Sequence, residues 1–151
     1  MKRFLALSLA LASVAVFLSG CDLISQLFGV AVSGTVSGTG MQLSSAQVLF
    51  TQGTDTYGES VSIPAGSSQS ASYTTIKVPK GTYDLSATVS SATSGSCVAL
   101  EYAVNDGATV TPTLQLNSVF NGTDYDYSFT ATGLSIQSDT TVDVVAYTNP
   151  C

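Results

Sequence analysis

The chain has 151 residues with four basic and ten acidic side chains, and it lacks histidine and tryptophan. Two of the basic residues lie in the first 20 positions, so the remaining 131 residues hold two lysines against ten carboxylates, a net charge of −8. Two lysines cannot build the basic surface that binds nucleic-acid phosphates, so nucleic acid is excluded as a partner. Hydrophobic residues make up 44% of the chain, which excludes disorder and predicts one folded domain.

The first 20 residues have the pattern of a secretory signal sequence, which we expect to be helical. Lys2 and Arg3 precede an apolar stretch over residues 4–18. A helix needs roughly 20 residues to cross the hydrocarbon of a bilayer, so a permanent transmembrane anchor is the weaker interpretation. We expect residues 1–20 to be removed on export.

The signal sequence ends in Leu18-Ser19-Gly20-Cys21, which resembles the lipobox of bacterial lipoproteins. The resemblance implies diacylglycerol on the Cys21 thiol, cleavage before Cys21 and acylation of the new N-terminus; a spare thiol behind an ordinary cleavage site is the alternative. Because each buried CH₂ contributes about 0.8 kcal/mol, two or three acyl chains hold a protein on a bilayer nearly permanently. We expect an envelope lipoprotein anchored to the inner or the outer membrane, with this covalent lipid and no other cofactor.

The only other cysteines are Cys97 and Cys151. Export would place both in a compartment where disulfides persist, so we expect them to pair, with two free thiols as the alternative. Closing a loop of that length stabilises a fold by roughly 4 kcal/mol in the chain-entropy model.

After a short tether at 21–29, the alternation of apolar and polar residues predicts an almost entirely β domain over residues 30–151. Strands are expected at 30–36, 46–51, 59–63, 72–78, 83–89, 98–104, 110–116, 125–129 and 142–147. Seven to nine short strands predict an antiparallel β-sandwich of immunoglobulin-like or transthyretin-like type, with a closed barrel as the alternative. Pro112 cannot donate to a ladder, so its strand is expected at an edge or a bulge.

Turn residues separate these strands, at 37–40, Pro79-Lys80-Gly81, Asn105-Asp106-Gly107 and Asn121-Gly122. Residues 52–72 are rich in Gly, Ser, Thr and Gln, and we expect a mobile polar segment there with an exposed loop at 65–70.

Three segments, Ser33-Gly34-Thr35-Val36, Ala46-Gln47-Val48 and the run from Val78 to Leu85, resemble the carboxypeptidase regulatory-like (transthyretin-like) domain. The likeness covers roughly residues 31–116 and is carried by a Gly-containing strand, an Ala-x-Val strand and a Pro-x-Gly-x-Tyr turn. Such domains are mostly non-catalytic parts of exported proteins. The resemblance therefore implies a scaffold or binding module, and it transfers no functional residue.

The residue types that catalysis commonly needs are sparse. Without histidine, His-based triads and the commonest metal ligand are missing, and no Ser-x-x-Lys or Gly-x-Ser-x-Gly motif occurs. We expect no enzyme, although carboxylates on different strands could still converge for glycoside cleavage. Asp124 with Asp126, or Asn105 with Asp106, could contact calcium, but neither run has the spacing of a calcium loop, so we expect no metal site.

The chain has seven tyrosines. Exposed aromatic rings can stack on sugars, and Tyr57, in the polar segment, and Tyr147, opposite the buried face, are the best candidates. The others in strands, Tyr83, Tyr102, Tyr125 and Tyr127, are expected in the core.

We therefore expect a membrane-anchored envelope lipoprotein that acts as a non-catalytic structural or protein-interaction module. Its expected partners are the membrane, through the anchor, and envelope proteins or glycan. The expected contacts are edge strands and the 52–72 segment. The alternative is a carbohydrate-binding lipoprotein associated with surface glycan handling.

Overall fold

The computed structural model describes residues 29–64, 69–92, 98–108, 110–111 and 119–148. The predicted signal sequence, the lipidation site Cys21 and the predicted disulfide between Cys97 and Cys151 lie outside these residues. Within them the chain forms nine strands in two sheets and no helix, so the predicted all-β fold is confirmed. No helix of the described residues is long and apolar enough to cross a membrane.

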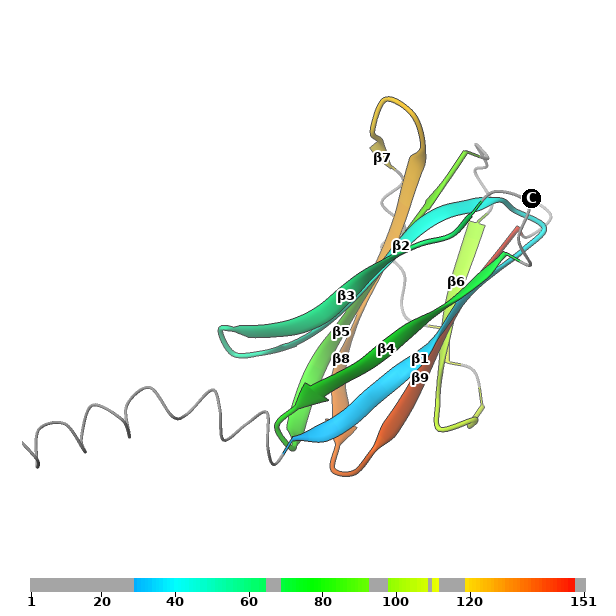
Figure 1. The fold of residues 1–151 in the computed structure, drawn as a ribbon. Coiled ribbons are helices and arrows are strands. Elements are labelled where there is room, and N and C mark those ends of the chain that lie inside the picture. Colours follow the sequence, from blue (N-terminus) through cyan, green and yellow to red (C-terminus); the bar gives the residue numbers. More distant parts are fainter. Residues whose placement is uncertain (1–28, 65–68, 93–97, 109, 112–118, 149–151) are drawn as a thin grey trace, which may run out of the picture.

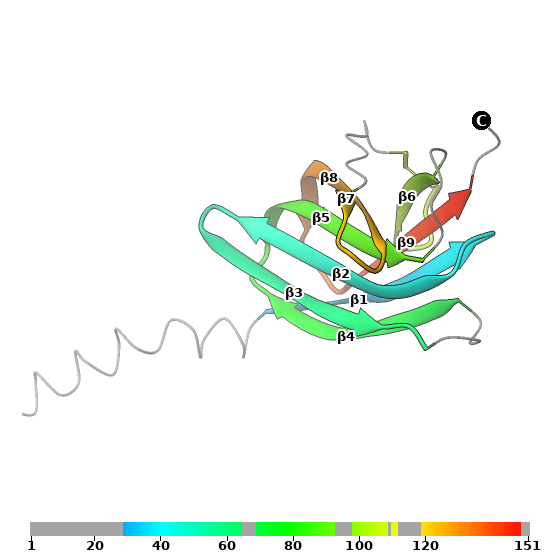
Figure 2. The ribbon, with the colours of Figure 1, turned by 90° about the horizontal axis from the view of Figure 1, so that it is seen from above.

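The two sheets pack face to face as a sandwich (Figures 1 and 2). Sheet A has the strand order β4-β1-β9-β6, and sheet B has the order β3-β2-β5-β8-β7. The strands are β1 (Val30–Thr39), β2 (Leu43–Gln52), β3 (Asp55–Ser62), β4 (Ser70–Val78), β5 (Gly81–Ser91), β6 (Val98–Val104), β7 (Val119–Phe120), β8 (Tyr125–Ile136) and β9 (Thr140–Thr148).

One pair of neighbouring strands departs from the predicted antiparallel arrangement. The other paired strands are antiparallel, but β1 and β9 run parallel, with Val32 beside Thr140 and Thr39 beside Tyr147. The two strands are far apart in sequence and no hairpin joins them, so both can enter sheet A from the same end.

Part of the expected polar segment at 52–72 is not a loop. Residues 55–62 form β3, which pairs along its whole length with β2, and β4 begins at Ser70. The chain reverses at Gly53, whose φ of 62° suits a tight hairpin turn. The predicted strand at 59–63 is thus confirmed, and it begins earlier than expected, at Asp55. Its polar composition fits an edge strand of sheet B, where small polar residues suit the exposed side.

The predicted turn at Asn105-Asp106-Gly107 is confirmed. Asn105 and Asp106 both have positive φ, and the Gly107 amide donates to the Val104 carbonyl at 2.9 Å. This places Val110 beside Tyr102 in an isolated bridge. The rest of the predicted strand at 110–116 lies largely outside the described residues.

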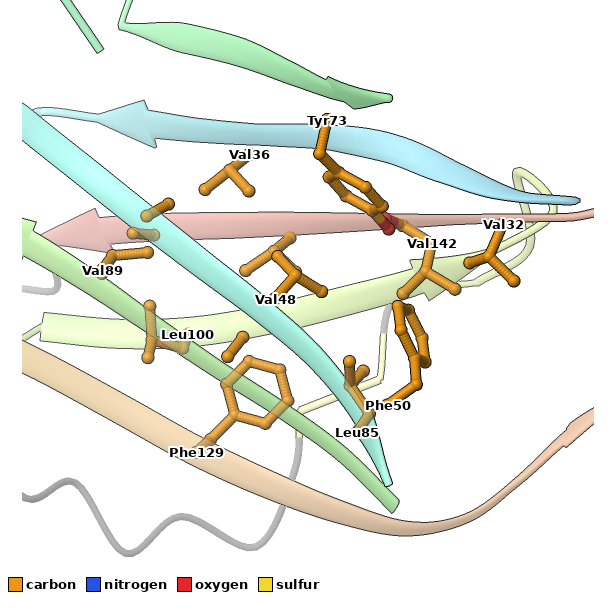
Figure 3. Close-up of a cluster of buried hydrophobic side chains, with 14 of the residues drawn as sticks. Val32, Val36, Val48, Phe50, Tyr73, Leu85, Val89, Leu100, Phe129 and Val142 are labelled. Atoms are coloured by element: carbon orange, nitrogen blue, oxygen red, sulfur yellow. The ribbon is translucent and has the colours of Figure 1, made fainter. Parts of the chain in front are cut away.

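The core lies between the sheets (Figure 3) and is built mainly from valine, leucine and aromatic side chains. The predicted inward face of β5 is confirmed, because Tyr83, Leu85, Ala87 and Val89 are all buried. Of the other tyrosines expected inside, Tyr127 is buried, whereas Tyr102 and Tyr125 are half-buried against the core. Further buried residues are Val32, Val36, Val48, Phe50, Leu100, Phe129, Ile136, Val142 and Val144.

Register shifts interrupt three strand pairs among the described residues, β1–β4, β2–β5 and β5–β8. In the β5–β8 pair, Tyr83 lies beside Leu134 and Leu85 lies beside Ala131, so β8 has one residue more than β5 in this interval. The extra residue falls at Gly133, which has a φ of 80°. Each shift inserts one residue and reverses the alternation beyond it. This is why Phe129 and Ile136, seven positions apart, can both face the core.

The connection from β4 to β5 crosses from sheet A to sheet B and is fixed by a tyrosine. The Tyr83 hydroxyl donates to the Pro79 carbonyl at 2.6 Å, and the Tyr83 ring meets Tyr57 edge to face at 6.2 Å. A tyrosine that bonds back to the backbone a few residues upstream is a known feature of sandwich corners. The predicted proline turn thus has a physical role in joining the sheets.

Replacing Tyr83 by Phe removes this hydroxyl and leaves the ring in place. We expect Tyr83→Phe to lower the free energy of unfolding by about 1 kcal/mol, measured by chemical denaturation. Tyr147→Phe, which removes a hydroxyl from the outer face of sheet A, should lower the free energy of unfolding by less than Tyr83→Phe does. Equal losses in the two variants would contradict a special role for the corner.

Candidate functional site

Tyr147 lies where the sequence predicts it, on the outer face of sheet A. Its hydroxyl donates to the Glu101 carboxylate of the neighbouring strand β6 at 2.7 Å, and Thr111 donates to the same oxygen at 3.1 Å. The hydrogen bond to Glu101 is the main cause that raises the pKa of Tyr147. The result is an oriented aromatic ring beside a carboxylate on the outer face of sheet A.

Tyr57 does not lie in a polar loop as expected. It is on β3, half-buried, and packs against the core with its ring at the edge of Tyr83. Stacking on a sugar requires an open ring face, so its packing leaves Tyr57 less suited to that role than Tyr147. The structure does not bring the two together, because Tyr57 points inward from sheet B and Tyr147 points outward from sheet A.

The carboxylates considered for calcium have neutral partners. Asp124 accepts from the Ser44 hydroxyl and Asp126 from the Ser90 hydroxyl, each at 2.7 Å. Asn121 donates to Asp126 at 3.1 Å. The described residues contain no group of three or more His, Cys, Asp or Glu side chains that could hold a metal.

The second pair considered for calcium lies elsewhere. The Asn105 side chain accepts from the Thr141 amide at 2.9 Å, and the Asn105 amide donates to the Thr141 carbonyl at 2.9 Å. Asn105 therefore ties its turn to the start of β9.

A cavity of about 140 Å³ opens at the end of the sandwich where β2 begins. It is lined by Gln42, Leu43, Ser44, Ile63, Gln69 and Ala92. Pockets for drug-sized ligands have volumes of roughly 300–1,000 Å³, so this cavity suits at most a very small molecule.

The β7–β8 hairpin projects from the same end (Figure 1), and its apolar side chains are exposed to solvent. Val119 and Phe120 are 60% and 57% exposed, the highest values for large apolar side chains in the described part of the chain. The Phe120 ring packs on Tyr125 at 5.0 Å between ring centroids. Sequence reasoning missed this surface, because a two-residue strand leaves no alternation to read.

A second feature that the sequence analysis did not predict is a tyrosine contact between β4 and β9 across β1. Gly34 pairs with Tyr73 of β4, and the Tyr73 hydroxyl reaches over Gly34 to donate to the Val142 carbonyl of β9 (Figure 3). A Cβ at Gly34 would collide with that carbonyl oxygen, so glycine is required. The sequence held one signal of this contact, because a glycine inside a predicted strand often marks a close approach of another backbone.

Burial raises the pKa of the Tyr73 hydroxyl, and the negative charge of Asp143 adds to the shift. Above pH about 10 the unfolded chain ionises this tyrosine while the folded chain keeps it protonated. The unfolded state then binds fewer protons, so the free energy of unfolding falls as the pH rises above that value. We expect Tyr73→Phe to flatten this alkaline decline in denaturation curves measured from pH 8 to 11; an unchanged slope would contradict the assignment.

Comparison with known proteins adds no relative, because no protein-family model, no curated protein and no solved structure matches the chain.

Proposed function

We propose that this chain is a membrane-anchored envelope lipoprotein whose β-sandwich is a non-catalytic protein-interaction module. The observation that carries the proposal is the exposed apolar pair Val119 and Phe120 at one end of the domain. Exposed apolar patches on soluble domains commonly mark interaction sites.

The position of this pair supports a role away from the membrane. The expected lipid on Cys21 is nine positions before β1 begins at Val30. Figure 1 places the start of β1 at one end of the sandwich and the β7–β8 hairpin at the other. A domain held at Val30 would therefore present Val119 and Phe120 outward, where a protein partner can reach them.

The surroundings of the hairpin indicate what such a partner would offer. Asp124 and Asp126 flank the apolar pair, and their carboxylates accept hydrogen bonds from neutral hydroxyl and amide groups. An apolar pocket edged by lysine or arginine would complement both features.

Carbohydrate binding is the second candidate, and the Tyr147–Glu101 pair favours it. An aromatic ring beside a carboxylate offers a stacking surface together with a hydrogen-bond acceptor.

If carbohydrate binding is the function, Tyr147→Ala should abolish saturable binding to a glycan array, and Tyr57→Ala should reduce that binding less.

Cys21→Ser tests the anchor. Without the thiol no diacylglycerol can be attached, so we expect the protein to move from the membrane fraction to the soluble fraction of the cell.

Intact-mass analysis of the unchanged protein should show loss of residues 1–20 and added lipid mass. A two-proton gain on reduction would support the Cys97–Cys151 disulfide. An unlipidated mass would contradict the anchor.

Replacing Val119 and Phe120 together by serine tests the interaction surface. We expect the double variant to lose the cross-links that the unchanged protein forms with an envelope protein in intact cells, while its thermal unfolding stays unchanged. Thr130→Ala, an exposed position on β8, is the matched control. Cross-links that persist in the double variant would rule out this end as the contact.

A further inference from the structure

Strand β1 is held on both sides within sheet A. It pairs antiparallel with β4, from Val30 beside Val78 to Ser37 beside Ser70, and parallel with β9. Its side chains Val30, Val32 and Val36 are buried in the core. The first strand of the domain is therefore among its most firmly embedded.

The parallel pairing with β9 has a gap at Gly34 and Thr35, and side chains fill it. The same register continues on both sides, from Ser33 beside Thr141 to Val36 beside Val144. Within the gap, the Asp143 carboxylate accepts from the Thr35 amide at 2.7 Å and from the Thr35 hydroxyl at 2.8 Å.

Two more contacts tie the same strands together. The Val142 carbonyl accepts from Tyr73, so β4 is joined to β9 across β1 (Figure 3). At the start of β1, the Ala31 amide donates to Asp139, in the turn before β9, at 2.9 Å. Side chains thus fasten β1 at two places, in addition to the backbone ladder.

We propose that this β1–β9 seam is a mechanical clamp, which keeps the domain folded when tension acts between the N-terminal anchor and the end of β9. The inference rests on the proposed function, because an anchor at Cys21 would deliver tension directly to Val30. The β1–β9 pair is parallel, so the start of β1 and the end of β9 lie at opposite ends of the sandwich.

The direction of the load explains why a parallel pair suits this role. Tension between Val30 and Thr148 runs along both strands and shears them, so the ladder bonds and the Asp143 and Tyr73 contacts are loaded together. Tension between Val30 and the turn at Ser138 would instead open the pair from one end, breaking one bond at a time. Resistance to force is set by the unfolding rate, which is slow only when many contacts must break at once.

Single-molecule pulling on the mature chain, from residue 21, tests the clamp. One geometry attaches handles at the two termini; the other attaches them at the N-terminus and at position 138. We expect a several-fold higher unfolding force in the first geometry. Equal forces in the two geometries would overturn the proposal.

Variants assign the resistance to named contacts. Asp143→Ala and Tyr73→Phe should unfold several times faster than the unchanged protein under the same end-to-end load. Asp126→Ala, which removes a carboxylate bonded to a serine in sheet B, is the matched control and should unfold at the unchanged rate. If the control weakens the domain as much as Asp143→Ala, the seam is not a clamp.

These measurements need no lipid and no partner, so their failure differs from failure of the proposed function. A protein that resists shear but carries no lipid would support the clamp and contradict the proposed anchor. A lipidated protein that unfolds at the same force in both geometries would support the anchor and contradict the clamp.

Discussion

Each sheet buries one apolar face against the other, and this mutual burial constrains the rest of the structure. A strand keeps its place only if its apolar side chains point inward, so a slip by one residue would turn a whole row of them into solvent. The register shifts at β1–β4, β2–β5 and β5–β8 show how the chain satisfies that constraint. Where the spacing of apolar residues changes parity, an inserted residue restores the inward face.

Two buried tyrosines satisfy their hydroxyl groups with backbone carbonyls, one nearby in sequence and one distant. Tyr83 bonds back to Pro79 at the crossing between the sheets, and Tyr73 bonds to Val142 across Gly34. Both rings contribute apolar surface to the core while their hydroxyls find backbone acceptors, which is how buried tyrosines avoid the cost of an unpaired polar group. The same two residues therefore fill the core and join its strands.

The ends of the sandwich have different characters, and the proposed function follows from that difference. The start of β1, where the expected anchor would enter, lies opposite the projecting β7–β8 hairpin with Val119 and Phe120. The seam of β1 with β9 lies between them. Tension that enters at the expected anchor and leaves at the end of β9 would load this seam in shear.

The sequence by itself determined the fold class and most strand positions, because period-two alternation and turn residues act locally. The run from Val98 to Val104 and the inward face of β5 followed directly from that pattern. The parallel pairing of β1 with β9, the Tyr73 contact over Gly34 and the exposure of Phe120 did not. Only the tertiary structure decided these, since each depends on which distant strand becomes a neighbour, and alternation along one strand carries no information about its partner.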